Sequence, residues 1–175
     1  MDKQFIVDNL GYRLGVYHRN AEIQIGVGNP NARVLVIQPT SKMPERDAVT
    51  GALKKFGMLG DSYRATTEIV SGGENNRYYL KELIQIIKPL VVVACGAEVT
   101  ALLKGNEVKS FSRCSGKKFR VQDMPEYVFY STVNPMDYGF ARAPQRLKDK
   151  GKEEWSRLEE IFHELKEKQE KERWM

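Results

Sequence analysis

Residues 77–105 read RYYLKELIQIIKPLVVVACGAEVTALLKG and predict a helix, a buried strand and a second helix in direct succession. Four apolar residues recur at helical spacing before Pro89 ends the first pattern: Leu80, Leu83, Ile84 and Ile87. The next segment, LVVVACG (90–96), is an unbroken apolar run rich in β-branched residues, which is typical of a strand buried on both faces. It leads directly into AEVTALLKG, a short helix that Gly105 ends. This stretch therefore predicts an α/β fold.

The rest of the chain repeats this alternation. Further strands are predicted by RVLVIQ (33–38), YRATTEIV (63–70) and EYVFYSTV (126–133), with KKFRVQ (117–122) as an edge strand and residues 1–28 as a strand-like lead-in. Further helices are predicted over 44–57 and, as a charged C-terminal helix, over about 152–173. Strands that alternate with helices predict a parallel, helix-covered sheet. We expect a three-layer α/β/α fold around a central, mainly parallel four-stranded sheet, with strands near 34–38, 63–70, 91–95 and 127–132.

Length and composition indicate one globular domain over residues 1–175, because the chain contains no internal repeat or low-complexity linker. Lys and Arg exceed Asp and Glu by 28 − 23 = 5, a mild basic bias that suits a polyanionic partner without naming one. Cys95 and Cys114 belong to no CxxC or Cys/His cluster, so we expect no metal and no other cofactor. With no signal-like or membrane-spanning apolar segment, we expect a cytoplasmic monomer that does not contact membranes.

Polar segments follow each predicted parallel strand. In open α/β sheets, ligands bind beyond the carboxyl ends of the strands. That rule places QPTSK, SGGENN, CGAE and VNPMDYG around one crevice. The last of these belongs to STVNPMDYGFAR (131–142), which puts Asn134, Asp137 and Arg142 just past the end of a strand. From the residues alone, Asn134-Pro135 is better interpreted as a turn that ends this strand, since Asn-Pro commonly starts turns.

Four segments in this order and spacing resemble the uracil-DNA glycosylase superfamily. They are GNPNARVLVIQPTSK (28–42), YLKELIQIIKPLVVVACGAEVTALLKG (79–105), VFYSTVNPMDYGFARAPQ (128–145) and EEWSRLEEIF (153–162). The resemblance spans roughly residues 28–162 and is closest to the iron–sulfur branch of the family. It implies a uracil-DNA-glycosylase-like fold and DNA as the partner.

The chain departs from the family at three places. The cluster cysteines are missing, and the position that matches one of them is Asn76, so the resemblance implies no iron–sulfur cluster here. The first motif reads Gln38-Pro39-Thr40-Ser41-Lys42 and has no carboxylate. In the second motif, the usual His is Asn134, although the mismatch-specific branch of the superfamily carries Asn-Pro-Ser there.

The resemblance implies candidate roles at the matching positions. Cleavage of an N-glycosidic bond requires stabilisation of the departing base and a water held near C1′ of the sugar. The Asn134 amide can donate to the base oxygen, while Gln38 and Thr40 line the pocket and can orient water. Candidate base- and DNA-binding residues are Ser41, Lys42, Met43, Asn75, Met136, Asp137, Tyr138, Phe140 and Arg142. The second-motif loop would insert into DNA and contact phosphate, with Lys42, Arg46, Lys117 and Lys118 as a basic rim.

The leading functional hypothesis is recognition of a nucleobase in DNA with excision of a non-standard or modified pyrimidine, which would make the protein a DNA glycosylase. The alternative is a catalytically inactive relative that binds DNA or a protein partner and regulates repair, replication or defence. A third class is a base- or nucleotide-processing enzyme that uses the same crevice for another bond. His18 and His163 are interpreted as structural or exposed residues, because neither falls near a motif of this crevice.

Overall fold

The computed structural model describes residues 3, 27–39, 48–67, 74–106 and 108–174. Within them, strands form one sheet in the order β1-β3-β2-β4-β6-β5. The strands are β1 Val27–Gly28, β2 Val34–Pro39, β3 Ser62–Thr67, β4 Val91–Cys95, β5 Lys117–Phe119 and β6 Val128–Thr132. Strands β3, β2, β4 and β6 run parallel, whereas β1 and β5 pair antiparallel at the two edges. The four expected parallel strands are confirmed, but the expected size of the sheet was wrong: an antiparallel strand extends it on each side, so that six described strands form it.

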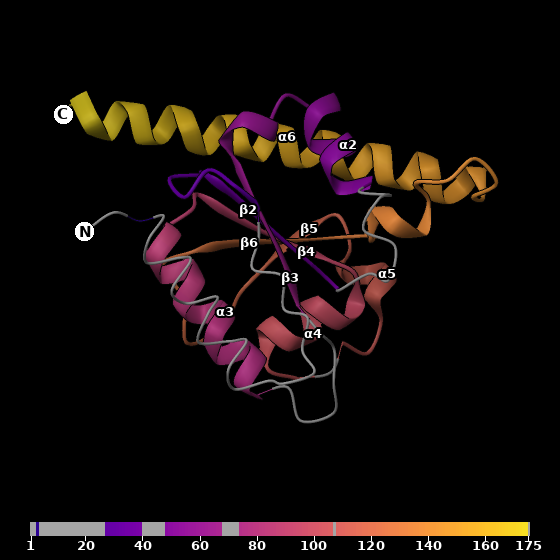
Figure 1. Cartoon of the computed structure of the whole chain (residues 1–175), viewed down its shortest axis with the longest axis horizontal. Coiled ribbons are helices and arrows are strands. Elements are labelled where there is room, and N and C mark those ends of the chain that lie inside the picture. Colours follow the sequence, from indigo (N-terminus) through magenta and orange to yellow (C-terminus); the bar gives the residue numbers. More distant parts are fainter. Residues whose placement is uncertain (1–2, 4–26, 40–47, 68–73, 107, 175) are drawn as a thin grey trace.

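Helices cover both faces of this sheet. They are α2 Ala48–Lys55, α3 Glu74–Ile87, α4 Ala97–Lys104, α5 Phe111–Cys114 and α6 Gln145–Trp174, with 3-10 turns η1 Leu59–Asp61 and η2 Pro135–Asp137. Helices α2 and α6 lie on one side of the sheet, and α3 and α4 lie on the other (Figure 1). The C-terminal helix was expected to begin near residue 152, and this start was wrong, because α6 already begins at Gln145. Residues 44–47 of the expected 44–57 helix and 68–70 of the expected 63–70 strand lie outside the described residues.

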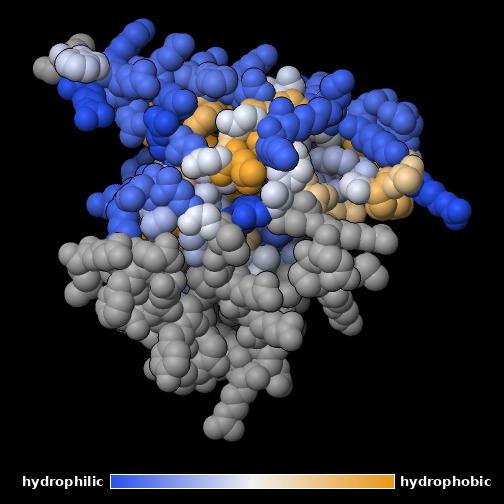
Figure 2. All heavy atoms as spheres, turned by 45° about the horizontal axis from the view of Figure 1, so that its top comes forward, coloured by the Kyte–Doolittle hydropathy of each residue, from blue (hydrophilic) through white to orange (hydrophobic). Residues whose placement is uncertain are grey.

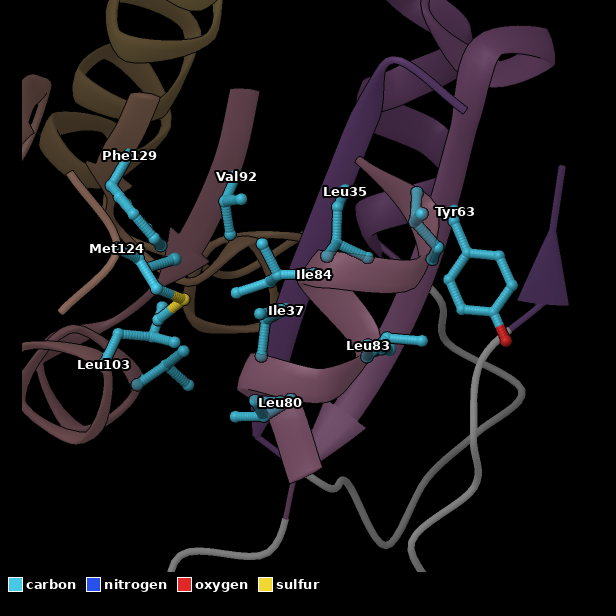
Figure 3. Packing of buried hydrophobic residues seen from close by; sticks show 14 of the residues in the cluster. Leu35, Ile37, Tyr63, Leu80, Leu83, Ile84, Val92, Leu103, Met124 and Phe129 are labelled. Atoms are coloured by element: carbon cyan, nitrogen blue, oxygen red, sulfur yellow. The ribbon is translucent and has the colours of Figure 1, made fainter. Parts of the chain in front are cut away.

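The face under α3 and α4 is filled by alternate residues of the strands. Leu35 and Ile37 of β2 and Val92 of β4 point to this side, where Ile84 of α3 lies among them (Figure 3). All four side chains are fully buried. Since successive side chains of a strand point to opposite faces, a strand that is apolar throughout supplies two cores at once. This is the physical reason that the apolar runs identified the inner strands.

The opposite core lies under α2 and α6. Val34 and Val36 of β2 pack there with Leu53 of α2 and with Trp155 and Leu158 of α6. The Trp155 ring also stacks on Phe56 at the end of α2, with the ring centroids 6.5 Å apart. Within the described ranges, none of the helices combines the length and apolar character that a membrane crossing requires.

Candidate functional site

The carboxyl ends of the parallel strands meet along one edge of the sheet. Ile37 of β2 is in register with Ala94 of β4, and Ala94 with Ser131 of β6. Gln38 and Asn134, which follow on β2 and after β6, therefore lie on the same edge with β4 between their strands. At the usual spacing of neighbouring strands, β2 and β6 are about 10 Å apart, and Asn134 lies two residues past the end of β6.

Asn134 forms a short turn whose hydrogen bonds fix the orientation of its amide. Its Oδ1 accepts a hydrogen bond of 3.1 Å from the backbone N–H of Met136, and its backbone carbonyl accepts one of 2.9 Å from Asp137 N–H. Because Oδ1 is thereby identified as the acceptor, the other arm of the amide is the Nδ2 donor. No acceptor for Nδ2 occurs among the described side chains and backbone. Asn134 thus caps a turn through its oxygen and carries two N–H donors that no described residue accepts.

The start of α4 lies directly beside this turn. A Cβ atom added to Gly96, the residue that joins β4 to α4, would lie 3.6 Å from the Asn134 Cβ atom. Gly96 N–H also donates to the Thr132 carbonyl at 2.8 Å, so the ends of β4 and β6 are tied together up to the last residue. The Asn134 turn therefore has a fixed position relative to the sheet edge.

Glu154 of α6 holds the segment that precedes Asn134 from within the protein. Its side chain is only 3% exposed. Oε1 accepts hydrogen bonds from Val133 N–H at 2.8 Å and from the Thr132 hydroxyl at 3.0 Å, and Oε2 accepts one from the Ser115 hydroxyl at 2.5 Å. A buried carboxylate is stable only with such partners, so the contacts define where β6 ends. Sequence reasoning missed Glu154, although it lies four positions before Leu158 and so on the inner face of the helix.

Tyr138 turns back into the protein instead of standing out from the loop. Its phenol lies against Gly151 of α6, where an added Cβ atom would be 2.6 Å from Oη. Burial raises the pKa of the Tyr138 phenol well above its usual range, and nearby Cys95 and Glu154 act in the same direction. The expected role of Tyr138 in DNA contact stays a prediction, and its present position makes it a support for the loop.

The remaining predicted residues of this loop differ in exposure. Phe140 is 43% exposed, and Arg142 is exposed as well. Met136 is half-buried in the η2 turn, and partial burial raises the pKa of the neighbouring Asp137 carboxyl. Asn134 and these loop residues are therefore brought together, with an aromatic ring and a guanidinium on the outer side.

Gln38 brings a buried acceptor to the same edge. Its Oε1 is buried and has no hydrogen-bond partner among the described residues, and the same is true of the Thr67 hydroxyl at the end of β3. Buried polar atoms in proteins almost always have a partner. Gln38 is in register with Thr66, so Gln38 and Thr67 point to opposite faces of the sheet and each is suited to bind water or a polar ligand on its own side.

Some predicted site residues cannot be placed. Thr40, Ser41, Lys42, Met43 and Arg46 lie outside the described residues. Asn75 belongs to the first turn of α3, but its side chain lies outside the description. The predicted basic rim is represented by Lys117 and Lys118, which are exposed on β5, and Lys117 is in register with Ser131 close to the carboxyl end of β6.

Neither a scan against protein-family models nor a search of curated proteins finds a match to this chain. In the part of the chain that is described, no group of three or more His, Cys, Asp or Glu side chains is arranged to hold a metal ion. The polar groups that the structure describes at the sheet edge are amides, hydroxyls and ammonium groups.

Proposed function

We propose that the protein has a uracil-DNA-glycosylase-like fold, recognises a nucleobase in DNA and excises a non-standard or modified pyrimidine. The observation that carries this proposal is the orientation of the Asn134 amide. Its oxygen is engaged by Met136 N–H, and its Nδ2 donor has no acceptor among the described residues. A donor fixed at the end of a central strand suits a carbonyl oxygen of a pyrimidine.

The chemistry assigned to this edge is hydrolysis of an N-glycosidic bond. The bond between C1′ and the base nitrogen breaks, and the base leaves with the bonding electrons. Asn134 Nδ2 donates to the base oxygen on which negative charge develops, and such preorganised donors stabilise transition states strongly. Water adds to C1′ and releases a proton, which neutralises the departing base. Gln38 Oε1, a buried acceptor on β2 at the same edge of the sheet, orients that water.

DNA would be held by the outer side of the loop and the adjacent edge strand. Phe140 is the exposed aromatic residue that can enter a base stack, and Arg142 follows it with a side chain suited to phosphate. Lys117 and Lys118 add positive charge beside β6. Together these residues supply an insertion element and a basic margin around Asn134.

One observation favours the second candidate function, a catalytically inactive protein that binds DNA or a protein partner. The buried polar side chains described at the ends of β2 and β3, Gln38 and Thr67, are an amide and a hydroxyl. Neither type accepts a proton from water near neutral pH, so they orient water without activating it as a base. A binding protein needs only the orientation of Asn134 and the cationic margin.

The deciding experiment measures free bases by mass spectrometry after incubation with DNA. The substrates carry uracil, thymine mismatches, hydroxymethyluracil and bulkier modified pyrimidines. Asn134→Asp is the informative variant, because a carboxylate oxygen can still cap Met136 N–H whereas the Nδ2 donor is lost. Release of one base by the wild type, reduced on the order of 10²–10³-fold in this variant, is the expected result.

Two other outcomes would redirect the assignment. Wild-type protein that binds DNA and releases none of the bases would support the inactive binding protein. Base release that is unchanged in Asn134→Asp would show that the leaving base is stabilised by another group, and the role of Asn134 would be abandoned. Asn134→Ala serves as the control that removes the cap and the donor together.

A further inference from the structure

A groove between α2 and α6 adjoins the candidate site but belongs to another face of the molecule. Its volume is about 330 Å³, and small-ligand sites in proteins begin at roughly 300 Å³. Aromatic side chains of Phe56, Tyr138 and Trp155 line it, together with small residues: Ala48, Gly51, Ala52, Gly139 and Gly151. Figure 2 brings the α2 and α6 side forward and shows apolar atoms in the middle of this face with hydrophilic atoms around them.

The charged residues at this groove have one sign. Lys55, Lys148 and Lys152 line it, and no carboxylate is among its described lining residues. The Lys55 ammonium lies 5.8 Å from the centre of the Phe56 ring, and Lys148 Nζ donates to the Ala141 carbonyl at 3.0 Å. The ammonium groups are therefore placed around the aromatic floor, an arrangement that is complementary to an anion carrying a flat ring.

The groove is continuous with the loop that follows Asn134. Tyr138 and Gly139 belong to that loop and also line the groove. Gly139 lies so close to α2 that an added Cβ atom would be 2.6 Å from the Ala48 Cβ atom. The loop thus forms the wall between the sheet edge and the groove, and a flexible chain that crosses the loop passes directly from one to the other.

We propose that the groove binds an unpaired stretch of nucleic-acid strand. A base lies on Phe56 and Tyr138, and the phosphates lie by Lys55 and Lys152. Aromatic platforms between cationic side chains are the usual means of holding single strands without sequence preference. The inference rests on the proposed function in one respect: the strand in the groove continues from the strand whose base reaches Asn134.

Gly51 offers a direct way to close the groove. It lines the groove, and an added Cβ atom would have nothing within 4 Å. Leucine also has a higher helix propensity than glycine, so Gly51→Leu should fill the groove without straining α2. Gly51→Ala is the control at the same position, and Gly60→Leu is the control for an added exposed leucine, since an added Cβ there also meets nothing within 4 Å.

Binding of a fluorescein-labelled oligothymidine by anisotropy is the first measurement. Gly51→Leu is expected to bind about tenfold more weakly than wild type, which corresponds to the loss of roughly one stacked base. Gly51→Ala and Gly60→Leu are expected to bind as wild type does. Wild type that does not bind the strand, or equal affinity of wild type and Gly51→Leu, would overturn the inference.

Salt dependence tests the charge component separately. Log affinity falls with log salt, and replacing Lys55 and Lys152 together by Ala should make this fall less steep by about 1.4. Each lost phosphate contact on a single strand contributes about 0.7 to the steepness. The matched control replaces Lys54 and Lys168, which are also exposed cations but do not line the groove. Equal slopes for the two double variants would contradict the proposal.

Two further arms separate the groove from the catalytic site and from another class of partner. Loss of binding in Gly51→Leu with no base release by wild type would leave the groove assignment standing and remove the glycosylase proposal. Base release by the wild type, with no effect of Gly51→Leu on binding, would leave the glycosylase proposal standing and remove the groove assignment. Displacement of the oligonucleotide from the groove by poly-glutamate at equal charge would assign the groove to an acidic polypeptide instead.

Discussion

Glu154 links the core of the protein to the position of a candidate functional residue. Its carboxylate is removed from solvent and accepts hydrogen bonds from Thr132, Val133 and Ser115. Val133 immediately precedes Asn134, so a change in these bonds moves the turn in which Asn134 Nδ2 is presented. The residue thus acts on the site through Val133 rather than by contact with a ligand.

Replacement of Glu154 by Ala should destabilise the protein by about 3 kcal/mol, because three buried donors lose their acceptor at once. Glu154→Gln keeps one oxygen acceptor and the side-chain volume, and should cost about half as much. Urea unfolding followed by circular dichroism measures both values. An unfolding midpoint of Glu154→Ala equal to that of the wild type would contradict the role given to this carboxylate.

Gly151 and Tyr138 form a second residue-scale test. Alanine normally stabilises a helix interior by about 1 kcal/mol relative to glycine. At Gly151 the added Cβ atom would lie 2.6 Å from Tyr138 Oη, so Gly151→Ala should instead destabilise the protein by about 1–3 kcal/mol. In a Tyr138→Ala background the ring is absent, and the same substitution should become neutral or stabilising. Unfolding free energies of the four proteins in this cycle give the coupling, and an unchanged effect of Gly151→Ala would rule out the contact.

Among the elements, Arg77 joins α3 to the end of α4 and to the turn before β6. Its Nε and Nη2 atoms donate to the Leu103 carbonyl at 3.3 and 3.1 Å, and Nη1 and Nη2 donate to the Asp123 carboxylate at 2.8 and 2.5 Å. These hydrogen bonds lower the pKa of Asp123 well below its usual range, and Lys81 adds to the effect at 3.2 Å. The guanidinium therefore satisfies a carbonyl at a helix terminus and an acidic turn together.

The Asp123 interaction should make a small contribution to stability that depends on pH. The pKa of Asp123 is lower in the folded state than in the unfolded state, where it is about 4. Its contribution to the free energy of unfolding is therefore complete above the unfolded-state pKa and declines as the pH falls below it. Asp123 is 39% exposed, so Asp123→Asn should cost no more than about 1 kcal/mol at neutral pH. Urea unfolding of both proteins from about pH 7 to about pH 3 should show the difference shrinking with acidification. A difference that grows toward low pH would contradict the assignment.

The elements differ in how much the sequence discloses about them. The four parallel strands were predictable because each is an apolar run that supplies both cores, as Val34 and Leu35 do on opposite faces of β2. The start of α6 at Gln145 was not predictable, because the first turns of this helix are polar and contain Gly151. A glycine ordinarily signals a break in a helix. That glycine is required by the Tyr138 ring packed on it, a long-range contact invisible in local patterns.

The candidate site shows the same division. The topology rule placed Gln38 and Asn134 on one edge, and the structure has them there. The inward direction of the Tyr138 side chain and the support of β6 by Glu154 both depend on how α6 crosses the sheet. No spacing of residues in the sequence encodes that arrangement. Position along a strand is a local property, whereas the direction of a loop side chain is a tertiary one.

At the scale of the whole molecule, two apolar cores share one set of strands. Ile84 of α3 belongs to the core on one face, and Ile161 of α6 belongs to the core on the other. Each core depends on β2 and β4, whose side chains alternate between them. If either layer of helices left the sheet, it would expose side chains of the same strands that the other layer covers. The domain should therefore unfold in one cooperative step.

Ile84→Val and Ile161→Val test this dependence with matched changes, because each removes one buried methylene group from a helix that packs on the sheet. Each should destabilise the protein by about 0.5–1.5 kcal/mol. The two side chains are separated by the sheet, so the double variant should show the sum within about 0.5 kcal/mol. Urea unfolding should give one transition with the same slope in all four proteins, whether followed by far-ultraviolet circular dichroism or by Trp155 fluorescence, which reports on the α6 side. If the fluorescence transition of Ile84→Val stayed at the wild-type midpoint while the circular dichroism transition moved, the two faces would unfold separately and the shared strands would not couple them.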